Sequence, residues 1–312
     1  MTVSVIIVSI GAKDYLKLCL NSLLKQSYPP LEIIVIDNSC RPDFFQDMHN
    51  LYPSVKFYPS PENLFYAAAL NKGIGFCRGD FVLCLNDDLV LDKDFIREAL
   101  KGFLVDDRVG SVSGKILRSD GKTLDSTGLF LSVWRTAKER GYSQIDRGQF
   151  NRNGFVFGAS GAAAFYRREM LESIKENGEY FDSDFGMFYE DLDLSWRAHR
   201  YGWWAYYLPA ALAYHVRGGS FRPDSGIGKA IARKYLNDQL HCGLIKNRYL
   251  TILKNESLPS FMLHFIPILI YDLCVWGYVI LFRPKVLRLF FGRSFEQLKG
   301  KKRKTRLFKK RF

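Results

Sequence analysis

Short apolar runs alternate with helical patterns along the first third of the chain. Runs rich in β-branched residues predict buried strands at Val3–Ser9, Leu31–Ile36, Val55–Tyr58 and Phe81–Leu85. Apolar residues at helical spacing predict the helices Asp14–Ser27, Phe44–Asn50, Asn63–Cys77 and Lys93–Val105. Strands that alternate with helices in this way are typical of βαβ units, so we expect an α/β fold with helices around a mostly parallel sheet.

The pattern after residue 105 is less regular. It predicts strands at Val109–Leu117, Leu124–Trp134, Trp203–Leu208 and Ala210–Tyr214, and a helix that begins at Glu190. Residues 135–153 are polar and contain several glycines, so we expect a mobile loop there, followed by a small, apolar segment at 154–164.

A long apolar stretch, Leu258–Phe282, precedes a basic tail. It is long enough to cross a bilayer but is interrupted by His264, Pro267 and Asp272. Residues 283–312 contain 13 Lys or Arg and one acid, so the tail carries +12 of the net charge of +13. A single span would translocate this tail against the positive-inside rule. We predict a helix pair, broken at Pro267, that lies in the cytoplasmic leaflet with the tail on anionic headgroups. A true span and a buried hairpin are the alternatives.

The charge distribution also bears on the domains and the compartment. The body of the chain is nearly neutral, which argues against nucleic acid as a partner. The six cysteines have no metal-site or disulfide spacing, and no signal-peptide pattern precedes the first strand. We therefore expect a catalytic domain at 1–240 that faces the cytoplasm and a membrane-associating helical region at 241–312. The oligomeric state is left open.

Polar side chains follow several of the expected strands. Ser9, Asp37, Asn38 and the pair Asp87-Asp88 come at or after strand ends. Ligands of open α/β sheets bind at the carboxyl ends of the strands. Two adjacent acids there favour a divalent ion such as Mg²⁺ or Mn²⁺ that carries a diphosphate. The alternatives are a solvated turn that caps the next helix and, for Asp37, an Asx turn.

Phosphate-binding glycine motifs are missing from the sequence. Neither GxGxxG nor GxxxxGK[ST] occurs, so the phosphates need another support, and a metal ion would provide one.

A second acidic motif follows at Glu190-Asp191, where acids also suit a first helical turn. A carboxylate beside aromatic residues such as Trp196 can act as a base on a sugar hydroxyl. His215 lies after a predicted strand and before a glycine pair, so it is either a buried core histidine or a metal ligand.

Taken together, these motifs resemble family 2 glycosyltransferases of the GT-A fold, over roughly Val3 to Ser220. The segments that carry the resemblance are Asn71-Lys72-Gly73-Ile74, Leu85-Asn86-Asp87-Asp88, the run FYEDLDLSWR at 188–197, and Pro209 with His215 and Ser220. The chain looks closest to the bacterial rhamnosyltransferase-like branch. It departs from many relatives in having Leu64-Phe65 after Glu62-Asn63, and Asp87 where they have proline.

The resemblance implies a role for each matching position. Asp191 would be the general base, with Glu190 and Trp196 supporting the acceptor. Ser9, Asp37, Asn38, Asn71 and Asp87 would contact the nucleotide, and Asp88 and His215 would bind Mg²⁺ or Mn²⁺.

The implied reaction is a single displacement with inversion. We expect transfer of L-rhamnose from dTDP-L-rhamnose to a lipid-linked glycan, as in O-antigen-like polysaccharide synthesis, at the cytoplasmic face of the membrane. The alternatives are a UDP-sugar-dependent transferase (GlcNAc, Gal or Glc) on a similar acceptor and a non-catalytic, membrane-tethered nucleotide or sugar binder. A polyanion-binding protein would rest on charge alone.

Overall fold

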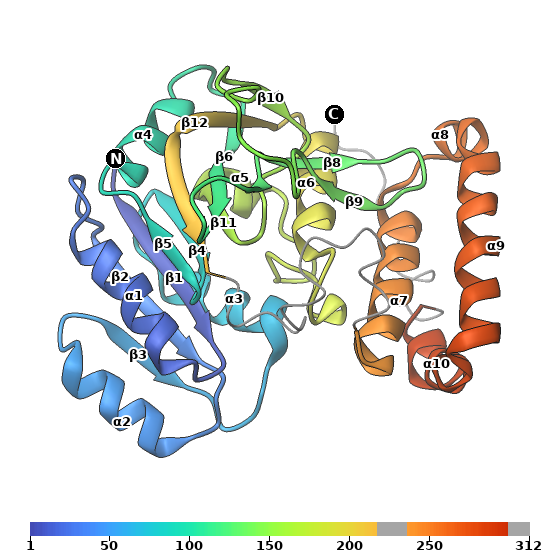
Figure 1. Cartoon of the computed structure of the whole chain (residues 1–312), viewed down its shortest axis with the longest axis horizontal. Coiled ribbons are helices and arrows are strands. Elements are labelled where there is room, and N and C mark those ends of the chain that lie inside the picture. The colour runs from blue at the N-terminus through green and yellow to red at the C-terminus, as the bar shows by residue number, and fades with distance from the viewer. Residues whose placement is uncertain (217–235, 299–312) are drawn as a thin grey trace.

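A computed structural model of the chain describes residues 1–216 and 236–298 (Figure 1). Ser220 and the clustered basic residues from Lys301 onward lie outside the described residues. The strands are β1 (Val3–Ser9), β2 (Glu32–Asp37), β3 (Lys56–Pro59), β4 (Phe81–Asn86), β5 (Leu89–Leu91), β6 (Val109–Arg118), β7 (Leu124–Ser126), β8 (Leu129–Leu131), β9 (Ala137–Glu139), β10 (Gly154–Val156), β11 (Ala163–Arg167) and β12 (Trp204–His215).

The helices fall into a group within the sheet region and a group that follows it. The first group is α1 (Lys13–Leu24), α2 (Pro42–Leu51), α3 (Phe65–Phe76), α4 (Phe95–Gly102), α5 (Arg168–Ser173), the 3₁₀ turn η1 (Ser183–Phe185) and α6 (Glu190–Arg200). The second is α7 (Asp238–Asn255), α8 (Leu258–Leu263), α9 (Phe265–Phe282), α10 (Pro284–Leu289) and the π-helical turn η4 (Phe290–Ser294).

A mixed sheet forms the centre of the molecule, in the order β10-β12-β6-β11-β4-β1-β2-β3. The strands β3, β2, β1 and β4 are parallel, β11 inserts antiparallel between β4 and β6, and β12 pairs in parallel with β6. The α/β fold class is therefore confirmed, with the parallel part concentrated in the first 86 residues. In this register Ser9 lies opposite Asp37, and Val8 opposite Asn86, so three strand ends are level.

Both faces of the sheet are covered because successive strand residues point to opposite sides. Val5 and Ile7 pack with the helices α1, α2 and α4, whereas Ile6 and Val8 pack with α3, α5 and α6. This explains why the strands read as continuous apolar runs.

The C-terminal helices share a core with the sheet region. Leu192 of α6 and Tyr189 just before it cluster with Ile245 and Leu250 of α7 and with Val279 of α9. In Figure 1 the helices α7 to α10 stand beside α6, on the side of the molecule away from β2 and β3.

Four expectations about local structure were wrong. The expected strand Leu124–Trp134 is divided into β7 and β8 around Gly128, whose φ of 110° breaks the extended backbone. The expected loop 135–153 contains β9, which pairs with β8. The two expected strands after Trp203 form one strand, β12, with a register shift between Leu208 and Leu212.

The fourth error concerns the C-terminal break, which lies at His264 and not at Pro267. Pro267 sits in the first turn of α9, where a proline lacks no hydrogen bond because those N–H groups have no helical partner.

Candidate active site

The acid pair Asp87-Asp88 lies directly after β4, and both side chains are buried. The Ser9 hydroxyl, at the end of β1, donates to Asp87 Oδ2 at 2.7 Å. Burial, together with the neighbouring charge of Asp88, raises the pKa of Asp87 to about 6, although the Ser9 bond opposes this shift. The site therefore concentrates negative charge that a cation would relieve.

His215, the last residue of β12, links two carboxylates. Its Nε2 lies 3.0 Å from Asp88 Oδ1, and its Nδ1 lies 2.7 Å from Asp125 Oδ2. These two bonds raise the pKa of His215 to about 9 despite its burial. Asp125, on β7, was not found by sequence reasoning because the pairing of β7 with β6 is what brings it here.

The donor set of Asp88 and His215 suits a divalent metal ion. A carboxylate oxygen and an imidazole nitrogen converge, and a second carboxylate on the other imidazole nitrogen is the usual support of a metal-binding histidine. No group of three or more His, Cys, Asp or Glu that could hold a metal occurs within residues 1–216 and 236–298. Among the described residues, Asp88 and His215 would therefore be the protein ligands of such an ion.

The second acidic motif opens α6. Asp191 Oδ2 accepts the N–H of Gly161 at 3.0 Å, and Oδ1 accepts the N–H of Leu192 at 2.7 Å. Burial raises the pKa of Asp191, while these two N–H groups lower it. Glu190 is buried beside it, and its Oε2 has no hydrogen-bond partner in the described part of the chain. Burial and the charge of Asp191 raise the pKa of Glu190.

The segment that precedes β11 brings the two acidic motifs together. The N–H of Gly161 binds Asp191, and the carbonyl of the next residue, Ala162, accepts the N–H of Asn86 at 3.0 Å. Tyr66 of α3 donates its hydroxyl to the Gly161 carbonyl at 2.9 Å. Burial and nearby groups, among them the carboxylates of both motifs, raise the pKa of Tyr66. The segment Gly161-Ala162 therefore links the end of β4, where Asp87-Asp88 follow, to the start of α6, where Glu190-Asp191 lie.

A third carboxylate, that of Glu139 on β9, is half-buried and lies near Asp191. Its oxygens accept the hydroxyls of Ser126 and of Ser160, the latter at 2.9 Å. Burial, followed by the charge of Asp191, raises the pKa of Glu139 to about 8. It fell in the expected loop, where no hydrophobic pattern marked it.

The predicted nucleotide residues on β2 and α3 have specific protein contacts. Asp37 is buried at the end of β2, and its Oδ1 accepts the N–H of Ser39 at 2.9 Å, as an Asx turn does. Asn38 Oδ1 accepts the N–H of Leu64 at 3.2 Å. Asn71 accepts the N–H groups of Tyr180 and Phe181 and donates to the Phe181 carbonyl at 2.7 Å. Nucleotide binding by these three residues stays a prediction.

Trp196, expected to support the acceptor, is a buried residue of α6 with 9% of its surface exposed. Its ring packs edge-on against Phe157, with the Arg135 guanidinium 5.7 Å from the ring centre. Its contact with an acceptor stays a prediction.

Comparison with known proteins identifies the family. Residues 4–175, more than half of the chain, match the model described as glycosyl transferase family 2. The chain belongs to this family. A poly-beta-1,6-N-acetyl-D-glucosamine synthase of Staphylococcus epidermidis is 27% identical over 200 residues, 62% of this chain and 45% of that protein. A synthase of the same name from Staphylococcus aureus is 24% identical and covers 64% and 46%. The chain thus spans just under half the length of these relatives.

Solved structures of similar fold include two with nucleotide sugars. S. aureus TarS 1-349 in complex with UDP-GlcNAc has a TM-score of 0.57 at 18% identity, covering 82% of this chain and 68% of that one. A mannosyltransferase from Pyrobaculum calidifontis, in complex with GDP-Man and Mn²⁺, has a TM-score of 0.54 at 18% identity, covering 92% and 72%. This family 2 chain therefore has the GT-A fold.

Proposed function

We propose that this family 2 chain is an inverting glycosyltransferase that moves a sugar from a nucleoside diphosphate donor to a glycan hydroxyl. The observation that carries the proposal is the meeting of the Asp87-Asp88 and Glu190-Asp191 pairs through the segment Gly161-Ala162. A transferase of this kind needs groups that balance the negative charge of the diphosphate and a base that takes a proton from the acceptor. We assign the first role to the Asp87-Asp88 pair and the second to the Glu190-Asp191 pair.

Asp191 is proposed as the base that takes the proton from the acceptor hydroxyl. Two backbone N–H groups fix its carboxylate in place. Its raised pKa brings its basicity closer to the working pH, which favours proton transfer. Glu190 has a buried oxygen without a partner among the described residues, so it can accept a further acceptor hydroxyl.

The other acid pair is proposed to hold the donor. Asp88 and His215 would hold Mg²⁺ or Mn²⁺, and a bound ion supplies positive charge for the diphosphate leaving group. Ser9 and Asp37, on adjacent strand ends, are proposed to contact the nucleoside, and Asp87 the ribose.

The relatives favour UDP-sugars as donors. The synthases named above assemble an N-acetylglucosamine polymer by name, and the TarS structure contains UDP-GlcNAc. We therefore place UDP-GlcNAc first and dTDP-L-rhamnose, which the sequence motifs suggested, second.

A membrane surface is proposed as the place of reaction, with a lipid-linked acceptor. Among the described helices, α9 alone is long and apolar enough to span a bilayer, with mean hydropathy 2.0 and 11% of that window buried. Its Asp272, however, pairs with Arg248 of α7 at 2.5 Å. Crossing the bilayer would break this pair and bury a charge in lipid, so we propose that α9 lies on the cytoplasmic leaflet.

The proposed domains follow from this arrangement. Residues 1–240 form the catalytic domain, and residues 241–312 form the membrane-associating region. Because α7 shares a hydrophobic core with α6, the two proposed domains meet in a packed interface.

The first test measures the melting temperature of the purified protein with UDP, dTDP, GDP or ADP, each with and without Mn²⁺. The second test measures sugar transfer from donors in which a sugar is linked to the nucleoside diphosphate that raised the melting temperature. A ligand at 100 times its Kd adds about 2.7 kcal/mol to the unfolding free energy, enough to detect. Metal-dependent stabilisation followed by transfer supports the proposal. Stabilisation without transfer from any donor would favour the non-catalytic binder, and no stabilisation would remove the donor site altogether.

A further inference from the structure

The turn that precedes the Glu190-Asp191 pair has an unfavourable backbone conformation. Gly186, Phe188 and Tyr189 have φ values of 66°, 72° and 71°, all in the left-handed region. For residues other than glycine this costs about 1–2 kcal/mol each. Tyr189 is also the N-cap of α6, so its backbone sets the direction in which Glu190 and Asp191 leave the turn. Something outside the turn must hold this conformation.

One side chain of α7 binds most of this turn. Asn247 is fully buried, and its Nδ2 donates to the carbonyls of Phe185, Met187 and Phe188 at 2.8, 2.8 and 2.7 Å. The two N–H groups of Nδ2 donate to three backbone carbonyls, so the turn encloses the Asn247 side chain. The remaining carbonyl, that of Gly186, faces the other way and accepts two N–H groups at the start of α3, at 2.9 and 3.0 Å.

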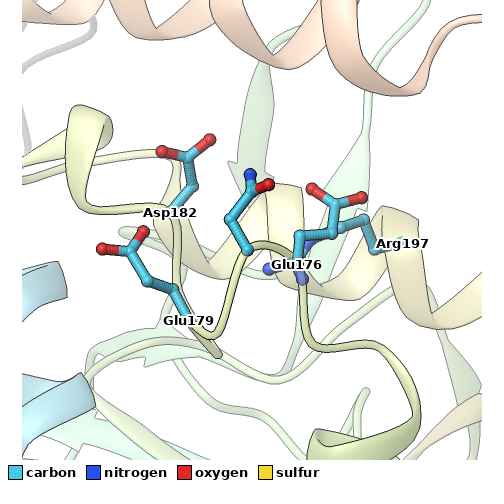
Figure 2. A pocket seen from close by; sticks show the side chains of 5 residues that line it. Glu176, Glu179, Asp182 and Arg197 are labelled. Carbon is cyan, nitrogen blue, oxygen red and sulfur yellow. The ribbon is translucent and has the colours of Figure 1, made fainter. Parts of the chain in front are cut away.

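A buried ionic network fixes α7 in place near its C-terminal end. Lys254 Nζ binds Asp193 of α6 at 3.0 Å, Asp182 at 2.8 Å and Glu176 at 3.4 Å. Two of these acids, Asp182 and Glu176, line the pocket in Figure 2, with Asp182 and Glu179 on one side and Glu176 and Arg197 on the other. The network explains how α7 is attached. Its ion pairs join Lys254 to Asp193, Asp182 and Glu176, whereas the Asn247 side chain donates directly to carbonyls of the left-handed turn.

We infer that Asn247 is a positioning residue for the acid pair: α7 holds the Gly186–Tyr189 turn so that Asp191 meets the N–H of Gly161. This inference rests on the proposed function, because it assigns Asn247 to the placement of the proposed base. The family match ends at residue 175, so the matched segment does not include this support.

The test compares Asn247→Ala with Thr251→Val, a matched control one turn further along α7. Thr251 is equally buried, and its hydroxyl donates at 2.8 Å to the Asn247 carbonyl within the helix. We expect Asn247→Ala to lower kcat by about tenfold to a hundredfold, as misplacement of a reacting group does. The Kd for UDP with Mn²⁺, measured by calorimetry, should stay within about twofold of the wild-type value. The proposed donor site lies at the strand ends and not on the turn that Asn247 binds. Thr251→Val should leave both unchanged.

The pH profile separates positioning from general loosening. If Asp191 moves to a more exposed position, its pKa falls toward its ordinary value, and the acidic limb of kcat/KM moves to lower pH. A kcat equal to wild type, or equal losses in both variants with an unmoved limb, would overturn the inference. If Asn247→Ala does not fold, Asn247→Ser replaces it, and an intermediate kcat is expected because one donor remains.

Failure of the proposed function gives a different result. If the wild-type protein transfers no sugar, the proposed function fails and takes the inference with it. If wild type transfers sugar and Asn247→Ala does so equally well, the inference alone fails.

Discussion

Replacing Asp191 with Asn should separate catalysis from stability at this site. The substitution keeps the size of the side chain and removes the proposed base. Loss of a general base lowers turnover by about 10²–10⁴, which corresponds to roughly 2.7–5.4 kcal/mol in activation free energy. The Kd for UDP with Mn²⁺ should remain near that of wild type, because the proposed donor residues lie on the strand ends.

The effect of Asp191→Asn on stability should be small because two contributions oppose each other. One of the N–H groups of Gly161 and Leu192 would face the Asn amide nitrogen, which costs about 1–3 kcal/mol. On the other side, the pKa of Asp191 is raised in the folded protein. A raised carboxyl pKa gives stability that is present below the unfolded pKa and is lost as pH rises through the folded pKa. Above the folded pKa the ionised carboxylate is therefore unfavourable, and Asn removes it.

Asp193→Asn is the matched control, two residues further along α6. Asp193 is fully buried and binds Arg197, Lys254 and Asn255, and burial opposes but does not cancel the lowering of its pKa by Lys254 and Arg197. Breaking such a buried pair costs about 3–5 kcal/mol. We expect this variant to lose stability in urea and to keep turnover within about tenfold where it is folded. Release of the sugar from the donor measures turnover, and urea unfolding measures stability. Turnover of Asp191→Asn within tenfold of wild type would refute the role of Asp191 as the base.

The remaining predictions concern pH, metal and membrane. The acidic limb of wild-type kcat/KM should lie above the ordinary range of aspartate, because Asp191 must be ionised to act and its pKa is raised; a limb near pH 4 would contradict this. Because the pKa of Glu139 is raised to about 8, the wild-type melting temperature should fall as the pH rises from about 4.3 to about 8. Glu139→Gln should make this fall less steep, and an unchanged slope would show that Glu139 does not titrate in that range. His215→Gln should abolish the Mn²⁺-dependent part of UDP stabilisation and keep the fold, with metal-dependent shifts in melting temperature as the readout. Leu281→Asp, at an α9 position 74% exposed, should weaken co-flotation with anionic vesicles, whereas Leu104→Asp, 69% exposed near α4, should not; equal flotation of both variants would argue against α9 as the membrane contact.

Much of the sheet region follows from local pattern. The strand expected at Val3–Ser9 is confirmed as β1, and those at Leu31–Ile36 and Phe81–Leu85 agree with β2 and β4 to within a residue at each end. These strands are buried on both faces, so each is marked by an uninterrupted apolar run. The errors fall where pairing between distant segments decides. β9 is polar and half exposed, and only its partner β8 makes it a strand.

The candidate site was only partly predictable for the same reason. Asp88 and Asp191 could be proposed from the sequence because each follows or opens an element that the hydrophobic pattern predicts. Asp125 and Glu139 lie on short strands with no signal of their own, and the β7–β6 and β9–β8 pairings place them. The sequence carried a weak signal for Asn247 that was missed, namely the polar run Lys246-Asn247-Arg248 within α7. The structure shows that all three side chains are buried. Consecutive buried polar residues require partners, but the sequence does not say which.

The contact between Asn247 and the turn also has a consequence for biosynthesis. Glu190 is 57 positions earlier in the chain than Asn247. At about 5–20 residues per second, the ribosome needs roughly 3–11 seconds to make the intervening stretch. During that time the sheet and its acids can assemble on the nascent chain while the turn still lacks its partner. A newly made polypeptide would thus place its Glu190-Asp191 pair only after α7 has been made, as the apolar helices that follow α7 emerge.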